Sequence, residues 1–160
     1  MNNKTQQINT LSLFNTIYTK DELVLFYHEV DQLIAEIFIG NQGLQEKMNQ
    51  LLSFEKKKNI MYYLTTMQVN TENIVMVKEA LSKIQFLGNQ IPVVSLQLAF
   101  EPTEPIIESL SSWFVQNIKT KVILDIHLER KIIGGALISL NGIYDDFTLK
   151  TKIETYFNQA

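Results

Sequence analysis

Histidines are among the side chains best suited to proton transfer and metal binding, and this sequence has two of them, His28 and His127. The 160 residues include no cysteine, which excludes a thiolate metal site, a cysteine nucleophile and a disulfide scaffold. A metal site needs several converging ligands. We therefore interpret His28 as a residue beside a helical apolar stripe and His127 as one on the polar face of a strand, and we expect no bound metal.

Acidic residues form two further candidate sites. Glu101, Glu104 and Glu108 surround a predicted helix start. They could be a carboxylate pair for acid–base catalysis or acids that stabilise the helix dipole. Asp145–Asp146 fall between a predicted hairpin and a helix. There they could bind a cation or serve as turn and capping residues. For both sets we favour the structural interpretation.

Two short motifs invite a phosphate-binding interpretation. Lys56–Lys58 is a basic run that would bind a phosphate or acidic partner, or form the solvated face of a helix. Gly134–Gly135 open a predicted strand, without the G-x-x-x-x-G-K-[ST] or G-x-G-x-x-G pattern of a phosphate loop. Glycines in that place indicate a bulge or a close backbone approach. We therefore predict no catalytic residue and no cofactor.

Composition limits the class of protein and its partners. The sequence is 46% hydrophobic and 19% charged, which is typical of a globular chain long enough for one domain or two small ones. A net charge of −3 and a pI near 5.4 argue against nucleic acid as the main partner. No stretch approaches the roughly 20 apolar residues of a membrane span, so we expect no direct membrane insertion.

Before residue 90 the apolar period is helical. Residues 1–18 are expected to be a polar tail and residues 19–90 a helical hairpin or small bundle. Thr19 and Glu22 form a capping box for the first helix, and a second helical segment runs over 43–67 with a break near Ser53.

A third helix is predicted to begin after Asn70. Its apolar positions are three and four residues apart, at Ile74, Val77, Leu81 and Ile84. This narrow seam suits contact with a helical partner, or closure of the protein's own core.

After residue 90 the pattern predicts strand, helix, strand, strand, short strand and helix. Alternating residues over 94–100 and 122–128 indicate strands, and Thr103 precedes a helix start. Asn141–Gly142 is a strong hairpin signal, and Thr148 caps the last helix. Residues 91–160 are thus expected to form a two-layer α/β module with both helices on one face of a small mixed sheet. The predicted fold class is α+β.

The end of the chain resembles a known family. From Glu129 the sequence reads E-R-K-I-I-G-G-A-L-I and then, further on, D-F-T-L-K. This resembles the C-terminal motif of the F-type ATP synthase delta subunit, the family of the oligomycin-sensitivity-conferring protein. The matching positions are Glu129, Ile133, Gly134, Gly135, Asp146, Thr148 and Lys150. Arg130 replaces the usual proline and Phe147 the usual glycine, and the resemblance extends from about residue 91 to the C-terminus.

The resemblance implies a non-catalytic subunit of the peripheral stalk. Such a subunit links the stalk b subunit to the alpha/beta head and resists rotor torque, on the cytoplasmic side of the membrane and peripheral to it. The family usually begins with a six-helix bundle that binds the alpha-subunit tails, whereas three or four helices fit between Thr19 and Leu87 here.

Two other functions remain open at this point. One is an adaptor or scaffold of another complex, built from a helical arm and an α/β module. The other is a small α/β enzyme that acts at the mouth of the sheet, near Glu101, His127 or Asp146.

Overall fold

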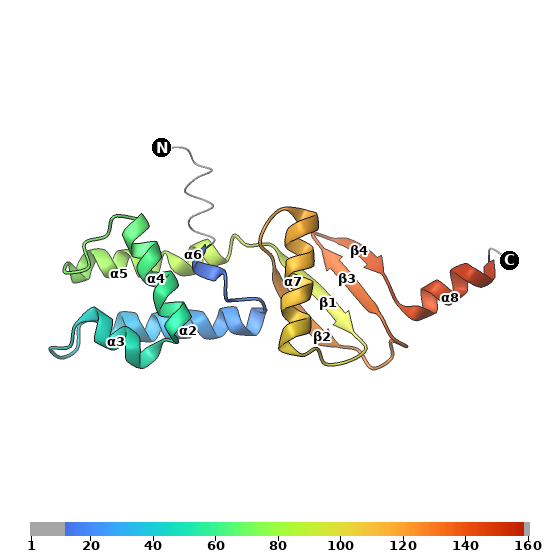
Figure 1. Ribbon diagram of the computed structural model, residues 1–160, viewed down its shortest axis with the longest axis horizontal. Coiled ribbons are helices and arrows are strands. Elements are labelled where there is room, and N and C mark those ends of the chain that lie inside the picture. The colour runs from blue at the N-terminus through green and yellow to red at the C-terminus, as the bar shows by residue number, and fades with distance from the viewer. Residues whose placement is uncertain (1–11, 159–160) are drawn as a thin grey trace. The chain divides into compact units, whose positions relative to one another are not determined.

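The computed structural model describes residues 12–158, and the side chains of 12–156. It confirms the predicted α+β class, with a helical part followed by a four-stranded mixed sheet (Figure 1). The described chain forms two compact units. The helical unit comprises residues 12–17 and 22–90, and the sheet unit comprises residues 18–21 and 91–158.

The helices of the N-terminal part follow one another through short connections. They are η1 (Ser12–Phe14), α2 (Lys20–Glu36), α3 (Leu44–Leu51), α4 (Phe54–Thr66), α5 (Ile74–Ser82) and α6 (Ile84–Gly88). The predicted break near Ser53 is confirmed, since the Ser53 side chain caps α4 at the backbone N–H of Lys56. The third helix begins at Ile74, later than predicted. Asn73 accepts hydrogen bonds from two backbone N–H groups and caps α5, whereas Asn70 forms a turn with Glu72.

The helical unit has an apolar core that includes part of the expected tail. Leu13, Phe14 and Ile17 are buried, and the Phe14 and Phe26 rings meet edge to face with centroids 6.0 Å apart. Residues 12–17, which we predicted as part of a polar tail, therefore belong to the packed unit. Residues 1–11 of that prediction lie outside the described residues.

The predicted third helix is divided at Lys83 into α5 and α6, and its apolar seam closes this core. Val77, Leu81 and Ile84 are buried in the helical unit, and only Ile74, 43% exposed, is left at the surface. The partner contact that we expected for all four residues is therefore restricted to Ile74, because the other three side chains already pack against their own unit.

A buried lysine on α3 binds backbone carbonyls at the C-terminal end of α2. Lys47 on α3 is 3% exposed, and its Nζ donates hydrogen bonds of 2.6 Å to the carbonyl oxygens of Glu36 and Ile39. A positive charge at a helix C-terminus satisfies carbonyls that have no partner within the helix. Lys47 thereby fixes α3 to the end of α2.

The sheet unit is built around β1 (Val93–Leu98), with strand order β2-β1-β3-β4. The other strands are β2 (Ile123–Leu128), β3 (Ala136–Leu140) and β4 (Ile143–Asp146), and the helices are α7 (Glu104–Ile118) and α8 (Leu149–Asn158). β1 and β2 are parallel and joined by α7, whereas β1, β3 and β4 are antiparallel. The Asn141–Gly142 hairpin is confirmed, since both residues have positive φ.

One helix covers the sheet. Val94, Leu96 and Leu98 of β1 pack with Phe114 of α7 in the buried core of the unit. None of the described side chains of α8 is buried, and α8 lies beyond the end of β4 (Figure 1). The expectation that both helices lie on the sheet is therefore wrong for α8. Leu149 and Ile153 of its apolar stripe are each 46% exposed.

Gly88 provides a test of the packing between α6 and α2. A Cβ at Gly88 would collide with the Tyr27 hydroxyl, which donates to the Gln85 carbonyl and the Asn89 side chain. We expect Gly88→Ala to lower the free energy of unfolding by about 1–3 kcal/mol in urea titrations. Adding Tyr27→Phe should recover part of this loss because the colliding oxygen is removed. A Gly88→Ala protein as stable as the wild type would contradict this account of the packing.

Candidate functional site

The motif glycines lie against the junction between β4 and α8. The backbone N–H of Leu149 donates to the Gly134 carbonyl at 3.1 Å, and that of Phe147 donates to the Ala136 carbonyl at 2.9 Å. These bonds join the start of β3 to the start of α8. We call this arrangement, formed by Gly134, Gly135, Asp146 and Thr148, the junction lock.

Gly135 is the tightest point of the junction lock. Its φ is +87°, and an added Cβ would collide with the Phe147 carbonyl oxygen and lie 2.9 Å from the Thr148 Cα. Both facts require glycine, because other residues rarely adopt this φ and the obstructing atoms are backbone. The close backbone approach suggested by the sequence is therefore present.

Thr148 caps α8, as predicted, because its hydroxyl accepts the Thr151 backbone N–H at 3.4 Å, and the turn before this cap is held by Asp146. Its Oδ1 accepts the Thr148 backbone N–H at 2.8 Å, and its Oδ2 accepts the Thr151 hydroxyl at 2.7 Å. The pKa of Asp146 is held below its ordinary value mainly by the hydrogen bond from the Thr148 N–H, and further by the Thr151 hydroxyl. Asp146 is thus a turn residue whose charged form is favoured in the fold.

The remaining motif residues lie outside the lock. Glu129 accepts the Lys131 backbone N–H at 3.0 Å and forms a local turn. Ile133 is 71% exposed, and Lys150 pairs with Glu154 at 3.8 Å on the surface of α8. The structure therefore brings four of the seven motif positions together.

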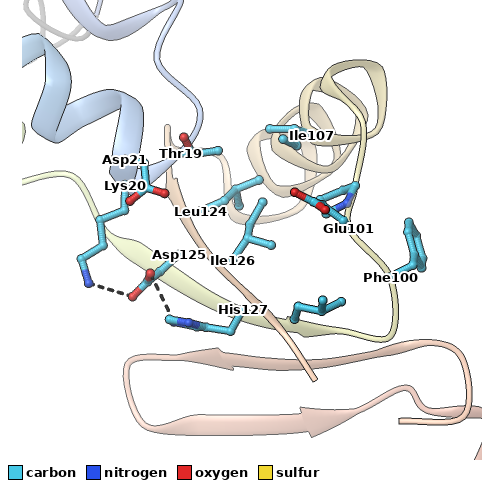
Figure 2. A pocket seen from close by; sticks show the side chains of 12 residues that line it. Thr19, Lys20, Asp21, Phe100, Glu101, Ile107, Leu124, Asp125, Ile126 and His127 are labelled. Atoms are coloured by element: carbon cyan, nitrogen blue, oxygen red, sulfur yellow. Dashed lines mark hydrogen bonds and ion pairs between the residues drawn. The ribbon is translucent and has the colours of Figure 1, made fainter. Parts of the chain in front are cut away.

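A second candidate site is a hollow of about 570 Å³ at the outer edge of β2. Figure 2 shows Leu124 and Ile126 on one side of this strand, and Asp125 and His127 on the other. Glu101 extends toward the hollow from the loop after β1. Residues that lie far apart in sequence line it: Thr19, Lys20, Asp21, Phe100, Glu101, Pro102, Ile107 and residues 124–128.

A small charge cluster forms one wall of the hollow. Asp125 pairs with Lys20 at 2.9 Å and with Nε2 of His127 at 3.3 Å. Burial raises the pKa of Asp125, but the hydrogen bond and charge of Lys20, helped by His127, outweigh burial and hold this pKa below its ordinary value. His127 turns toward Asp125, on the side of the strand away from Leu124 and Ile126 (Figure 2).

The other sequence candidates are dispersed. Among the three clustered acids only Glu101 lines the hollow, since Glu104 and Glu108 are exposed on α7. His28 is an exposed residue of α2. The lysine run makes separate contacts, in which Lys56 pairs with Glu29 at 2.7 Å, Lys57 with Asn49 and Lys58 with Glu55.

Sequence reasoning missed Lys20 and Asp125. Asp125 and His127 are two positions apart on one face of a predicted strand, and this spacing was a local signal for the contact between them. Lys20 could not be found in this way, because it is 105 positions away in the sequence. Over residues 12–158, no group of three His, Asp or Glu side chains is placed to hold a metal ion.

Comparison with known proteins finds no family model that matches the chain and no matching curated protein. Within the described range, no helix combines the length and apolar character needed to cross a bilayer.

The junction lock predicts different effects for two glycines of similar φ. We expect Gly135→Ala to lower the free energy of unfolding of the sheet unit by more than about 2 kcal/mol, since it adds a backbone collision to the strain of positive φ. Gly142→Ala, at φ +80° with open space around it, should cost about 1 kcal/mol. Urea titration of both variants measures the difference. Equal losses would contradict the lock.

The charge of Asp146 predicts a pH dependence. Because its pKa is lowered in the folded chain, its contribution is present above the ordinary aspartate pKa and is lost as pH falls through the lowered value. The amide NMR signal of Thr148 should report this titration with a midpoint below that of a free aspartate. Asp146→Asn should abolish it, whereas Asp145→Asn should leave it in place.

Proposed function

We propose that this protein is a non-catalytic subunit of the peripheral stalk of an F-type ATP synthase. In this role it links the b subunit to the alpha/beta head, so that the head does not turn with the rotor. The role implies a location at the cytoplasmic face of the membrane, held there by the other subunits.

The observation that carries the proposal is the junction lock. Gly134 and Gly135, before β3, pack on the backbone beside Asp146 and Thr148, at the end of β4, across the Asn141–Gly142 hairpin. A motif whose members meet in space has a physical reason to persist as a set. The hairpin alone brings these positions together. What supports the resemblance is that glycine stands where an added Cβ would collide with the backbone, and aspartate where it accepts the Thr148 N–H.

The lock also suits a part that transmits force. Its hydrogen bonds and close backbone contact fix how the chain passes from β4 into α8. The helix then exposes apolar side chains at Leu149, Ile153 and Tyr156, the last of which is 73% exposed. This spacing of four and three residues is typical of a helix that packs on another helix. We assign this face to the b subunit.

The helical unit has exposed apolar side chains of its own. Phe38, Ile74, Val75 and Met76 are exposed on it. We assign contact with the head to these residues in place of the buried seam. Two units, each with its own core and its own exposed apolar residues, meet the demand for an adaptor with two binding faces.

Co-purification tests the proposal. We expect the tagged full-length chain, isolated in mild detergent from cells that make it, to carry the alpha, beta and b subunits. Ile153→Asp should reduce recovery of the b subunit several-fold, because it places a charge in the apolar stripe. Lys152→Asp serves as the matched control, since Lys152 is the exposed residue just before Ile153 on α8.

Recovery of the chain without synthase subunits, under conditions that keep the synthase intact, would contradict the proposal. A stable set of other partners in that experiment would instead indicate an adaptor of another complex. Equal recovery of b with both α8 variants would reject the assignment of the α8 face alone.

A further inference from the structure

β2 is an edge strand, and its backbone groups alternate in direction. The N–H groups of Ile123 and Glu129 donate toward the β1 side, to Pro92 and Leu98 carbonyls at 2.9 and 2.8 Å. The N–H of Leu124 points the other way and donates to the Tyr18 carbonyl at 2.8 Å. The period of two in a strand then directs the N–H and C=O groups of Ile126 and Leu128 to the same outer side.

A short stretch of the chain already uses this edge. Thr19 pairs with Leu124 in the parallel sense, and the chain then enters α2 at Lys20. No strand in the described part of the chain pairs with the outer edge beyond this point. The edge at Ile126 and Leu128 is therefore open, and it borders the hollow.

The hollow can receive side chains on both faces of an added strand. On the α7 side, Ile107, Ile126 and Phe100 provide apolar contacts, and Glu101 provides a carboxylate. The opposite side has the charge cluster of Asp125 and its partners. The side chains of an added strand alternate between these two sides. One set would therefore meet the apolar contacts and Glu101, and the other set would meet the charge cluster.

The charge of the hollow defines the partner further. Lys20, Asp125 and His127 contact one another, whereas no ion pair within residues 12–158 involves Asp21 or Glu101. These two acids leave the rim with excess negative charge. A basic side chain is therefore favoured there, and an anionic ligand is disfavoured.

We propose that the open edge of β2 binds an extended peptide segment of a partner protein as an added strand. The segment has apolar residues at alternate positions and one Lys or Arg that meets Glu101. The proposal rests on the edge and the hollow alone, and it does not depend on membership of a synthase.

The other edge strand is a weaker candidate. All four residues of β4 are exposed, and two of them are Asp145 and Asp146. Charged residues on an edge oppose strand addition. Asp146 is also held in the junction lock.

The test uses the full-length chain, labelled with ¹⁵N, and a blocked nine-residue peptide. In the peptide, valine alternates with threonine and one central valine is replaced by lysine. We expect amide shifts centred on Ile126 and Leu128, and slower hydrogen exchange at these two amides. A peptide of the same sequence with N-methylated amides cannot pair as a strand and should lose these effects.

Charge reversal tests the role of Glu101. Glu101→Lys should weaken binding of the lysine peptide by about five-fold, and a peptide with glutamate in place of lysine should then bind more tightly than the lysine peptide. Glu104→Lys is the matched control, since Glu104 is an exposed acid nearby that does not line the hollow. It should leave the preference for lysine unchanged.

Three outcomes would overturn the proposal. The first is an absence of shifts at Ile126 and Leu128 up to millimolar peptide, or shifts centred on β4. The second is equal binding of the lysine and glutamate peptides to the wild-type chain. The third is protection of the same amides without peptide in a chain that sediments as a dimer, which would assign the edge to a second copy.

Discussion

The close approach of Gly135 to the backbone of Phe147 and Thr148 is the constraint on which the end of the sheet unit depends. Any side chain at this position would collide with main-chain atoms that cannot rotate away. The approach brings the first residues of β3 against the first turn of α8, where hydrogen bonds and the Asp146 carboxylate hold them. A glycine pair thus has a structural role that needs no ligand, and the direction in which α8 leaves the sheet follows from it.

The two edges of the sheet differ for physical reasons. β4 is short, exposed and acidic, and one of its acids holds the turn into α8. β2 is paired at one residue by the Tyr18–Thr19 segment and is open beyond it, beside a hollow with apolar and acidic walls. An open edge with side-chain pockets suits recognition of an extended segment, whereas a charged edge resists pairing. One sheet can therefore combine a protected edge with a receptive one.

Apolar stripes at helical spacing are buried in one unit and exposed in the other. Val77, Leu81 and Ile84 are buried within the helical unit, whereas Leu149, Ile153 and Tyr156 of α8 are exposed. The sequence pattern is of the same kind in both cases. The difference lies in whether another element of the chain lies over the stripe, and periodicity carries no information about that.

Local sequence determined the element types after residue 18, the break at Ser53, the Asn141–Gly142 hairpin and the α+β class, because turn, cap and period signals act over a few residues. It also marked the residues of the junction lock as a set. The predicted Asn141–Gly142 hairpin already brings the two ends of this set together. Only the tertiary structure decided that Leu13, Phe14 and Ile17 are core, and that Lys20 pairs with Asp125. These facts depend on contacts between segments far apart in the chain. Chain folding fixes such contacts, and no local pattern encodes them.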